Sequence, residues 1–187
     1  MLKHIRIKAL QYFQRALFLL LLGCTCASFA ADSSPSLING VETPYPAPLL
    51  MGITAWVNSD PIKLSDMQGK VILIEFWTSS CPYCKTALPF VNKWYSRYHD
   101  KGLLIIGIHS PKNDEEQNQT LVKDAVSKYD IHYPVAMDNN FETWENYNVQ
   151  GWPSFYLINK KGNVVYVSYG ADRFDIIDNN IRSLLKE

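Results

Sequence analysis

Two short stretches of the chain are almost continuously apolar, "VILIEFW" at 71–77 and "LLIIGIH" at 103–109. Apolar runs of this length, rich in β-branched residues, are typical of strands that are buried on both faces of a sheet. Between them, apolar residues recur at helical spacing from Pro82 to a stop at Gly102. A strand, a helix and a second strand in this order predict a right-handed βαβ unit with parallel strands.

The segments around this unit show the same periodic signals, bounded by glycine, proline or asparagine. The expected elements are an edge strand at 53–58, a helical turn at 64–70, helices at 115–130, 141–148 and 174–187, a strand at 133–137, and an antiparallel hairpin within 154–170. The apolar face of the helix at 115–130 is expected to include Leu121. The sum is an α/β fold with a mixed central sheet and helices on both faces.

Length and composition fit one folded domain, since 187 residues with 47% hydrophobic content can bury a sizeable core. We expect this domain at 49–187, preceded by a proline-rich linker at 31–48. Lys+Arg and Asp+Glu both total 18, so no net field attracts the chain to nucleic acid. Nucleic acid is therefore not an expected partner.

The N-terminal segment 1–30 has the layout of a secretory signal peptide. Basic residues precede an apolar run from Ala16 to Ala30, which ends on small residues suited to cleavage after Ala30. This run is shorter than the roughly 20 residues that span a bilayer, so an uncleaved anchor is the least expected outcome. We expect export to the periplasm, with an anchor through a lipidated Cys24 in a lipobox-like sequence as the alternative.

Removal of that segment leaves Cys81 and Cys84 as the only cysteines of the mature chain. The pair lies where the strand at 71–77 gives way to a helix. Unpaired N–H groups and the positive end of the helix dipole favour a thiolate at Cys81. A thiolate is the nucleophile of thiol–disulfide exchange, and Cys84, one turn later, is placed to attack the mixed disulfide that results. The pair therefore predicts a redox site.

Two other interpretations of the cysteine pair remain. A structural disulfide would add little stability, because the loop that it closes is minimal. A metal site needs further ligands, and the histidines at 99, 109 and 132 are not at zinc-finger spacing. No metal and no cofactor are expected. Copper held by the two cysteines and a histidine, in a protein without exchange activity, is the alternative to an enzyme.

Several motifs then follow one another in the order that a known family shows. They are Gly69-Lys70-Val71, Phe76-Trp77-Thr78, Cys81-Pro82-Tyr83-Cys84-Lys85, Leu88-Pro89, and the segments 102–111, 133–139 and 151–164. Together they resemble the thioredoxin-like TlpA/ResA family of exported thiol–disulfide oxidoreductases, above all the thioredoxin-like domain that ends DipZ-type proteins. The resemblance covers about 49–187 and implies a thioredoxin-like fold. ResA-like members carry a Glu soon after the second cysteine, where this chain has Thr86-Ala87. This departure weakens an assignment to cytochrome c maturation.

The resemblance implies roles for individual residues. Cys81 resembles the attacking cysteine, Cys84 the resolving one, and Pro153 the cis-proline that faces the pair. A cis bond there would expose the backbone of Trp152 to an incoming extended peptide. Glu75 occupies the strand position where thioredoxins carry a buried acid, and it could take the proton from Cys84 through a water. The alternative for Glu75 is a carboxylate at the strand edge that reaches solvent.

The residues next to the cysteines are expected to contact substrate or to tune the site. Trp77 is assigned to the rim, with a packing role as the alternative, and His109 is interpreted as a polar surface residue. Pro82 and Tyr83 set how well the thiolate is stabilised, and hence the direction of electron flow. The family resemblance favours a monomeric reductase of protein disulfides that a membrane thiol reductase keeps reduced. A DsbA-like oxidant is the alternative.

Overall fold

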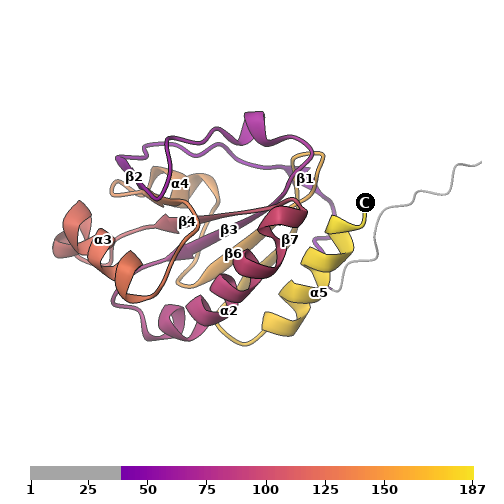
Figure 1. Cartoon of the computed structure of the whole chain (residues 1–187). Helices are drawn as coiled ribbons and strands as arrows, with labels where there is room; N and C mark the ends of the chain where they lie inside the picture. The colour runs from indigo at the N-terminus through magenta and orange to yellow at the C-terminus, as the bar shows by residue number, and fades with distance from the viewer. Residues whose placement is uncertain (1–38) are drawn as a thin grey trace, which may run out of the picture. The chain divides into compact units, whose positions relative to one another are not determined.

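Residues 39–187 are described in a computed structural model of the chain (Figure 1). The predicted signal peptide, with Cys24, and the first part of the predicted linker lie outside these residues. Within residues 39–187, no helix combines the length and the apolar character needed to cross a membrane.

A seven-stranded sheet forms the centre of the fold, with the strand order β1-β7-β6-β3-β4-β5-β2. The strands are β1 (Tyr45–Pro46), β2 (Ala55–Val57), β3 (Val71–Trp77), β4 (Leu103–His109), β5 (Val135–Met137), β6 (Ser154–Ile158) and β7 (Asn163–Tyr169). The pairs β3·β4 and β4·β5 are parallel, and the other pairs are antiparallel. The structure thus confirms the predicted mixed sheet, the βαβ unit, the hairpin and the edge position of β2.

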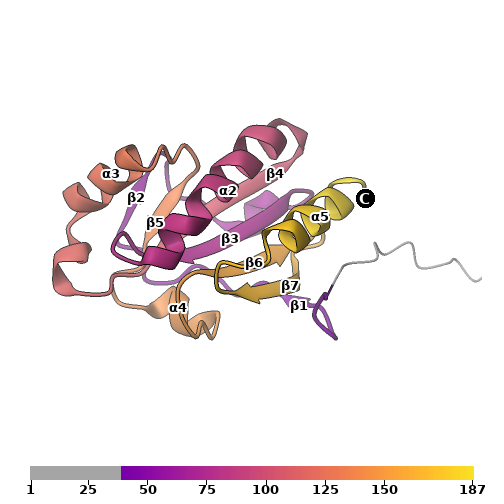
Figure 2. The same ribbon diagram turned by 90° about the horizontal axis from the view of Figure 1, so that it is seen from below.

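Helices and 3-10 turns cover both faces of this sheet. They are η1 (Leu64–Met67), α2 (Pro82–Tyr98), η2 (His99–Lys101), η3 (Asp114–Gln117), α3 (Gln119–Lys128), α4 (Glu142–Asn146) and α5 (Phe174–Leu185). One apolar cluster joins α2, α3 and α5 to the sheet, and Figure 2 shows α2 and α5 in front of β3 and β6. The second cluster joins α4 and apolar residues between 47 and 67 to the opposite face.

Strand β3 is the central strand, and every one of its residues is buried. Because successive side chains of a strand point to opposite faces, Leu73, Glu75 and Trp77 share one face, and Ile74 and Phe76 share the other. Leu73 and Trp77 belong to the cluster that includes α2. Glu75 therefore lies on the face of the sheet that α2 covers, beneath the helix that begins with the cysteine motif.

The predicted helix at 115–130 is divided at Asn118. The Asn118 side-chain oxygen accepts a hydrogen bond from the Thr120 backbone N–H at 2.8 Å, so Asn118 caps α3 and ends η3. The prediction that Leu121 is buried on the helix face is wrong, since this side chain is 48% exposed. Within η3, Glu116 is the buried residue.

The packed structure starts upstream of residue 49, where the domain was expected to begin. The Val41 N–H donates to the Val165 carbonyl at 2.9 Å, and the Ala47 N–H donates to the Gly162 carbonyl at 2.9 Å. Between these contacts, β1 pairs with the start of β7. The second half of the predicted linker thus adds a short strand to the exposed edge of the hairpin.

Candidate active site

The cysteine pair stands at the start of α2, as the sequence pattern predicts. Cys81 is the N-cap residue, and its Sγ accepts a hydrogen bond from the Cys84 backbone N–H at 3.4 Å. Both cysteines are free thiols. Cys81 is 8% exposed, whereas Cys84 is completely buried. Cys81 is therefore the sulfur of the pair that a partner molecule can reach first.

The segment around Trp152 and Pro153 lies against Cys81, although 71 residues separate Trp152 from it in sequence. The Trp152–Pro153 peptide bond is cis. The Cys81 thiol donates to the Trp152 carbonyl oxygen, with an S···O distance of 3.8 Å. The Trp152 ring packs against Trp144, with ring centroids 4.7 Å apart. The backbone before β6 thus forms the wall opposite the cysteines.

The other predicted contact residues divide into exposed and buried ones. Pro82 and Tyr83 are exposed, and Tyr83 is 68% exposed, next to the entrance to Cys81. Trp77 is completely buried and packs edge-on against His109, with ring centroids 5.1 Å apart. Trp77 therefore does not lie on the rim of the site, as expected, but has the packing role that was the alternative.

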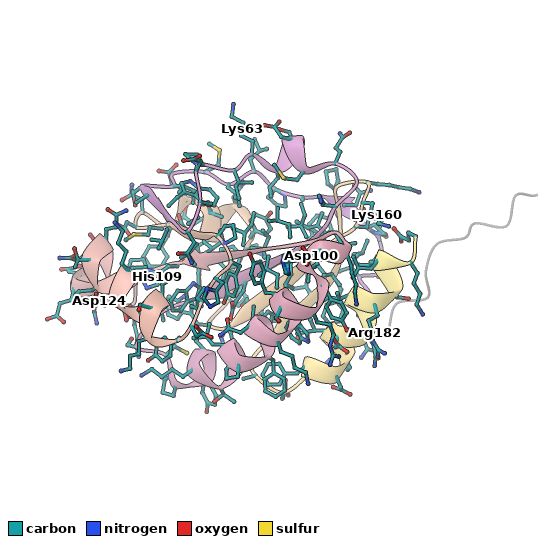
Figure 3. All side chains as sticks on the ribbon, viewed as in Figure 1. Lys63, Asp100, His109, Asp124, Lys160 and Arg182 are labelled. Atoms are coloured by element: carbon teal, nitrogen blue, oxygen red, sulfur yellow. The ribbon has the colours of Figure 1, made fainter. Side chains whose placement is uncertain are left out.

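His109 is not the surface residue that the sequence indicated. It ends β4 with no exposed area, and Figure 3 labels it among the interior side chains. Its two ring nitrogens have no hydrogen-bond partner within residues 39–187. Burial lowers the pKa of His109 to about 4, against an opposing effect of the Glu116 charge. His109 is thus a neutral imidazole at physiological pH.

Glu75 is a completely buried carboxyl group beneath the cysteines. The Tyr133 hydroxyl donates to Glu75 Oε2 at 2.9 Å, and Oε1 has no partner in the described part of the chain. Burial raises the pKa of Glu75 to about 8, although the Tyr133 hydrogen bond acts in the opposite direction. Burial also raises the pKa of the Cys84 thiol, and the Glu75 charge is among the causes that raise it further. The two groups therefore influence each other's protonation.

Gly107 gives Tyr133 access to Glu75. It is the residue of β4 directly opposite Glu75. A Cβ atom at this position would lie 3.0 Å from Trp77 Nε1 and 3.1 Å from Tyr133 Cε2. The missing side chain thus leaves room for the two rings beside β4, and the Tyr133 ring carries the hydroxyl that reaches Glu75.

Glu116 is a second buried carboxyl group, and the sequence interpretation did not single it out. Its side chain is 6% exposed and accepts hydrogen bonds from the Thr78 and Ser79 hydroxyls and from the Ser80 and Lys112 backbone N–H groups. Burial acts to raise its pKa, but these four donors outweigh burial and lower it to about 2. Glu116 is therefore ionised at physiological pH.

Among residues 39–187, no group of three or more His, Cys, Asp or Glu side chains is arranged to hold a metal ion.

Comparison with known proteins places the chain in a family. The family model described as Redoxin matches residues 46–183. The chain belongs to the Redoxin family. This redoxin is 40% identical over 144 residues to DipZ of Mycobacterium tuberculosis, a match that covers 75% of this chain and 21% of DipZ. It therefore spans about a fifth of that relative's length.

Shorter relatives match the redoxin chain over nearly their whole length. The thiol-disulfide oxidoreductase YkuV of Bacillus subtilis is 26% identical over 142 residues, which cover 76% of this chain and 95% of YkuV. A solution structure of a thioredoxin-like protein in the oxidized form superposes with a TM-score of 0.71 at 25% identity, covering 78% of this redoxin and 98% of that chain. These matches confirm the thioredoxin-like fold and the TlpA/ResA-like family, in which relatives such as YkuV and ResA are named thiol-disulfide oxidoreductases.

Proposed function

We propose that the chain is an exported enzyme that reduces disulfide bonds in other proteins through Cys81 and Cys84. The observation that carries this proposal is the unequal exposure of two adjacent free thiols at the start of α2. Cys81 keeps a small exposed area of 8%, whereas Cys84 has none. This is the arrangement that a nucleophile and a resolving thiol require.

In the first step, the Cys81 thiolate attacks one sulfur of a substrate disulfide. A bond forms between Cys81 Sγ and that sulfur, the substrate S–S bond breaks, and the second substrate sulfur leaves as a thiolate that takes a proton. The Cys84 N–H, 3.4 Å from Cys81 Sγ, supports the negative charge on the attacking sulfur. The start of a helix adds the favourable end of its dipole.

In the second step, Cys84 attacks Cys81 Sγ in the mixed disulfide. The bond to the substrate breaks, the substrate leaves as its second thiol, and a Cys81–Cys84 disulfide forms, so two electrons have passed to the substrate. Burial raises the pKa of the Cys84 thiol, so this attack needs a proton acceptor. Glu75 fits this role in its ionised form, whose share grows as the pH approaches its pKa of about 8, a value closer to that of a thiol than an ordinary carboxylate has.

The substrate is a segment of protein in extended conformation. Support comes from the Trp152 carbonyl beside Cys81, where an added strand would lie, and from the exposed Pro82 and Tyr83 on the other side. The oxidised pair must be reduced again by a dithiol donor, and a membrane thiol reductase is the donor class that the TlpA/ResA resemblance implies. Export rests on the signal-peptide layout of residues 1–30.

Reduction of insulin by dithiothreitol, with and without catalytic amounts of protein, tests this function. The wild-type protein is expected to accelerate the reaction, and Cys81→Ser and Cys84→Ser are the matched variants that should not. An unchanged rate together with tight binding of Cu(I) would replace the enzyme by the copper-binding alternative.

The direction of electron flow needs its own measurement, the reduction potential of the cysteine pair in a glutathione or dithiothreitol buffer. A reductase is expected to lie near thioredoxin, at about −270 mV, or below it. A potential near that of DsbA, about −120 mV, would make the protein an oxidant.

A further inference from the structure

Three residues, Thr78, Ser79 and Ser80, connect the end of β3 to Cys81, and we call them the pre-cysteine turn. This turn fixes where the cysteine pair stands relative to the sheet. The Cys81 backbone N–H donates to the Thr78 carbonyl at 3.3 Å. A backbone hydrogen bond from Thr78 also reaches the Cys84 sulfur and lowers the pKa of that thiol against the effect of burial. Both cysteines are therefore held by the backbone of Thr78.

Glu116 attaches the pre-cysteine turn to the loop after β4. Its Oε1 accepts from the Ser79 hydroxyl at 2.9 Å and from the Ser80 N–H at 2.9 Å. Its Oε2 accepts from the Thr78 hydroxyl and from the Lys112 N–H, the latter at 2.6 Å. Each residue of the turn thus donates one hydrogen bond to a single carboxylate, which comes from a segment 36 to 38 positions away in sequence.

The base of Glu116 is itself fixed. Its backbone N–H donates to the Asn113 side-chain oxygen at 3.2 Å and to the Asn113 carbonyl at 3.2 Å, which closes the turn of η3. A charged acceptor held in this way makes stronger hydrogen bonds than a neutral one. It also has no proton of its own, so it only accepts, and three of its four hydrogen bonds come from the turn.

We propose that Glu116 is a positioning residue for the cysteine pair, acting through the pre-cysteine turn to hold Cys84 in line with Cys81. This inference rests on the proposed exchange function and adds a residue that contacts neither sulfur. Its consequence is specific to the second step, in which the Cys84 sulfur must approach the Cys81 sulfur along the S–S axis. Loosening the turn should slow that intramolecular attack more than it slows the first attack by Cys81.

The test uses the full mature protein and Ellman's reagent, which places thionitrobenzoate on the accessible cysteine as a mixed disulfide. Release of the second thionitrobenzoate then reports the first-order attack by Cys84. Glu116→Gln keeps the shape of the side chain and removes its charge. We expect this variant to release the second group at least about ten-fold more slowly, because misplacement of reacting groups by fractions of an ångström to 1 Å has effects of this size or larger.

The control is Thr143→Val, which removes a buried cross-link of α4, on the face of the sheet opposite α2. The Thr143 hydroxyl donates to the Met51 carbonyl at 2.6 Å and accepts from the Met51 N–H at 2.8 Å. This variant should lose stability in urea but change the release rate by less than about two-fold, since the affected groups touch neither the turn nor the pair. Equal slowing in both variants would reduce Glu116 to a general structural role and overturn the proposal.

A second pair of variants covers the case in which Glu116→Gln does not fold. Thr78→Val removes one donor to Glu116 at constant shape, and Thr78→Ser restores the hydroxyl. We expect slow release of the second thionitrobenzoate in Thr78→Val and a wild-type release rate in Thr78→Ser. Wild-type release rates in both variants would contradict the proposal. A wild-type protein that fails to reduce insulin would refute the proposed function, whereas the release rates would still report on positioning.

Discussion

Glu75 and Glu116 are two buried carboxyl groups near one pair of cysteines, yet at neutral pH Glu75 is mostly protonated and neutral whereas Glu116 is ionised. Glu75 receives one hydrogen bond, from Tyr133, and burial raises its pKa to about 8. Glu116 receives four, which lower its pKa to about 2. Four donors thus outweigh burial at Glu116, whereas the single donor at Glu75 does not. One group can store a proton, and the other can hold backbone in place.

The largest expected effect comes from Glu75→Gln. Between pH 4.5 and 8 the folded protein keeps a proton on Glu75 that the unfolded chain releases, so the wild-type free energy of unfolding falls as pH rises. At pH 7 this costs about 3 kcal/mol, at roughly 1.4 kcal/mol per pKa unit. The neutral Gln avoids the cost, so we expect the variant to be more stable by about that amount at pH 7.

Urea titrations at pH 5 and pH 7 check this. The stability advantage of Glu75→Gln over the wild type should grow with pH. Its rate of thionitrobenzoate release by Cys84 should fall, because no group takes the proton from the Cys84 thiol. A constant difference between the two proteins at both pH values would show that Glu75 does not hold a proton in the folded state.

Glu116→Gln should lower the free energy of unfolding, by less than Glu75→Gln raises it. The stabilisation from Glu116 is fully present above pH 4.5 and is lost as pH falls through the folded pKa of about 2. At pH 6 we expect a loss of about 1–2 kcal/mol, reduced by solvent screening because Glu116, although only 6% exposed, is not as deeply buried as Glu75. The stability curves of variant and wild type should converge toward pH 2 in acid titrations with urea. Curves that stay parallel would mean that the charge of Glu116 contributes nothing.

The smallest effect is expected from Tyr133→Phe. The Tyr133 hydrogen bond lowers the pKa of Glu75, so its removal should raise that pKa by less than about one unit, given that one hydrogen bond contributes about 1 kcal/mol. The pH dependence of Cys84 release, measured by stopped flow, should move upward by the same amount. A downward shift would reverse the sign and contradict the assignment of Glu75 as the proton acceptor.

The parts of the site that sequence could predict are those set by neighbours along the chain. Strand β3, the start of α2 and the placement of Cys81 and Cys84 follow from local periodicity and from Pro82. The opposing wall at Trp152–Pro153 was expected only through the family resemblance, because no local signal connects it to Cys81.

The parts that sequence could not predict depend on contacts between distant segments. Tyr133 and Glu75 are 58 positions apart, and Glu116 and Thr78 are 38 apart. Glu116 lies in the polar stretch 113–119, which has the composition of an exposed loop. His109 and Leu121 were misjudged for the same reason, since their burial is decided by what packs over β4 and α3.

The central claim, that Cys81 attacks protein disulfides and Cys84 resolves the product, is tested most directly by trapping. Cys84→Ala and Cys81→Ala are each incubated with insulin whose disulfide bonds are intact, and covalent adducts are measured by mass spectrometry. The account predicts a disulfide-linked adduct through Cys81 in Cys84→Ala and almost none in Cys81→Ala, where the remaining thiol is buried. An adduct in Cys81→Ala alone, or in neither variant, would contradict it.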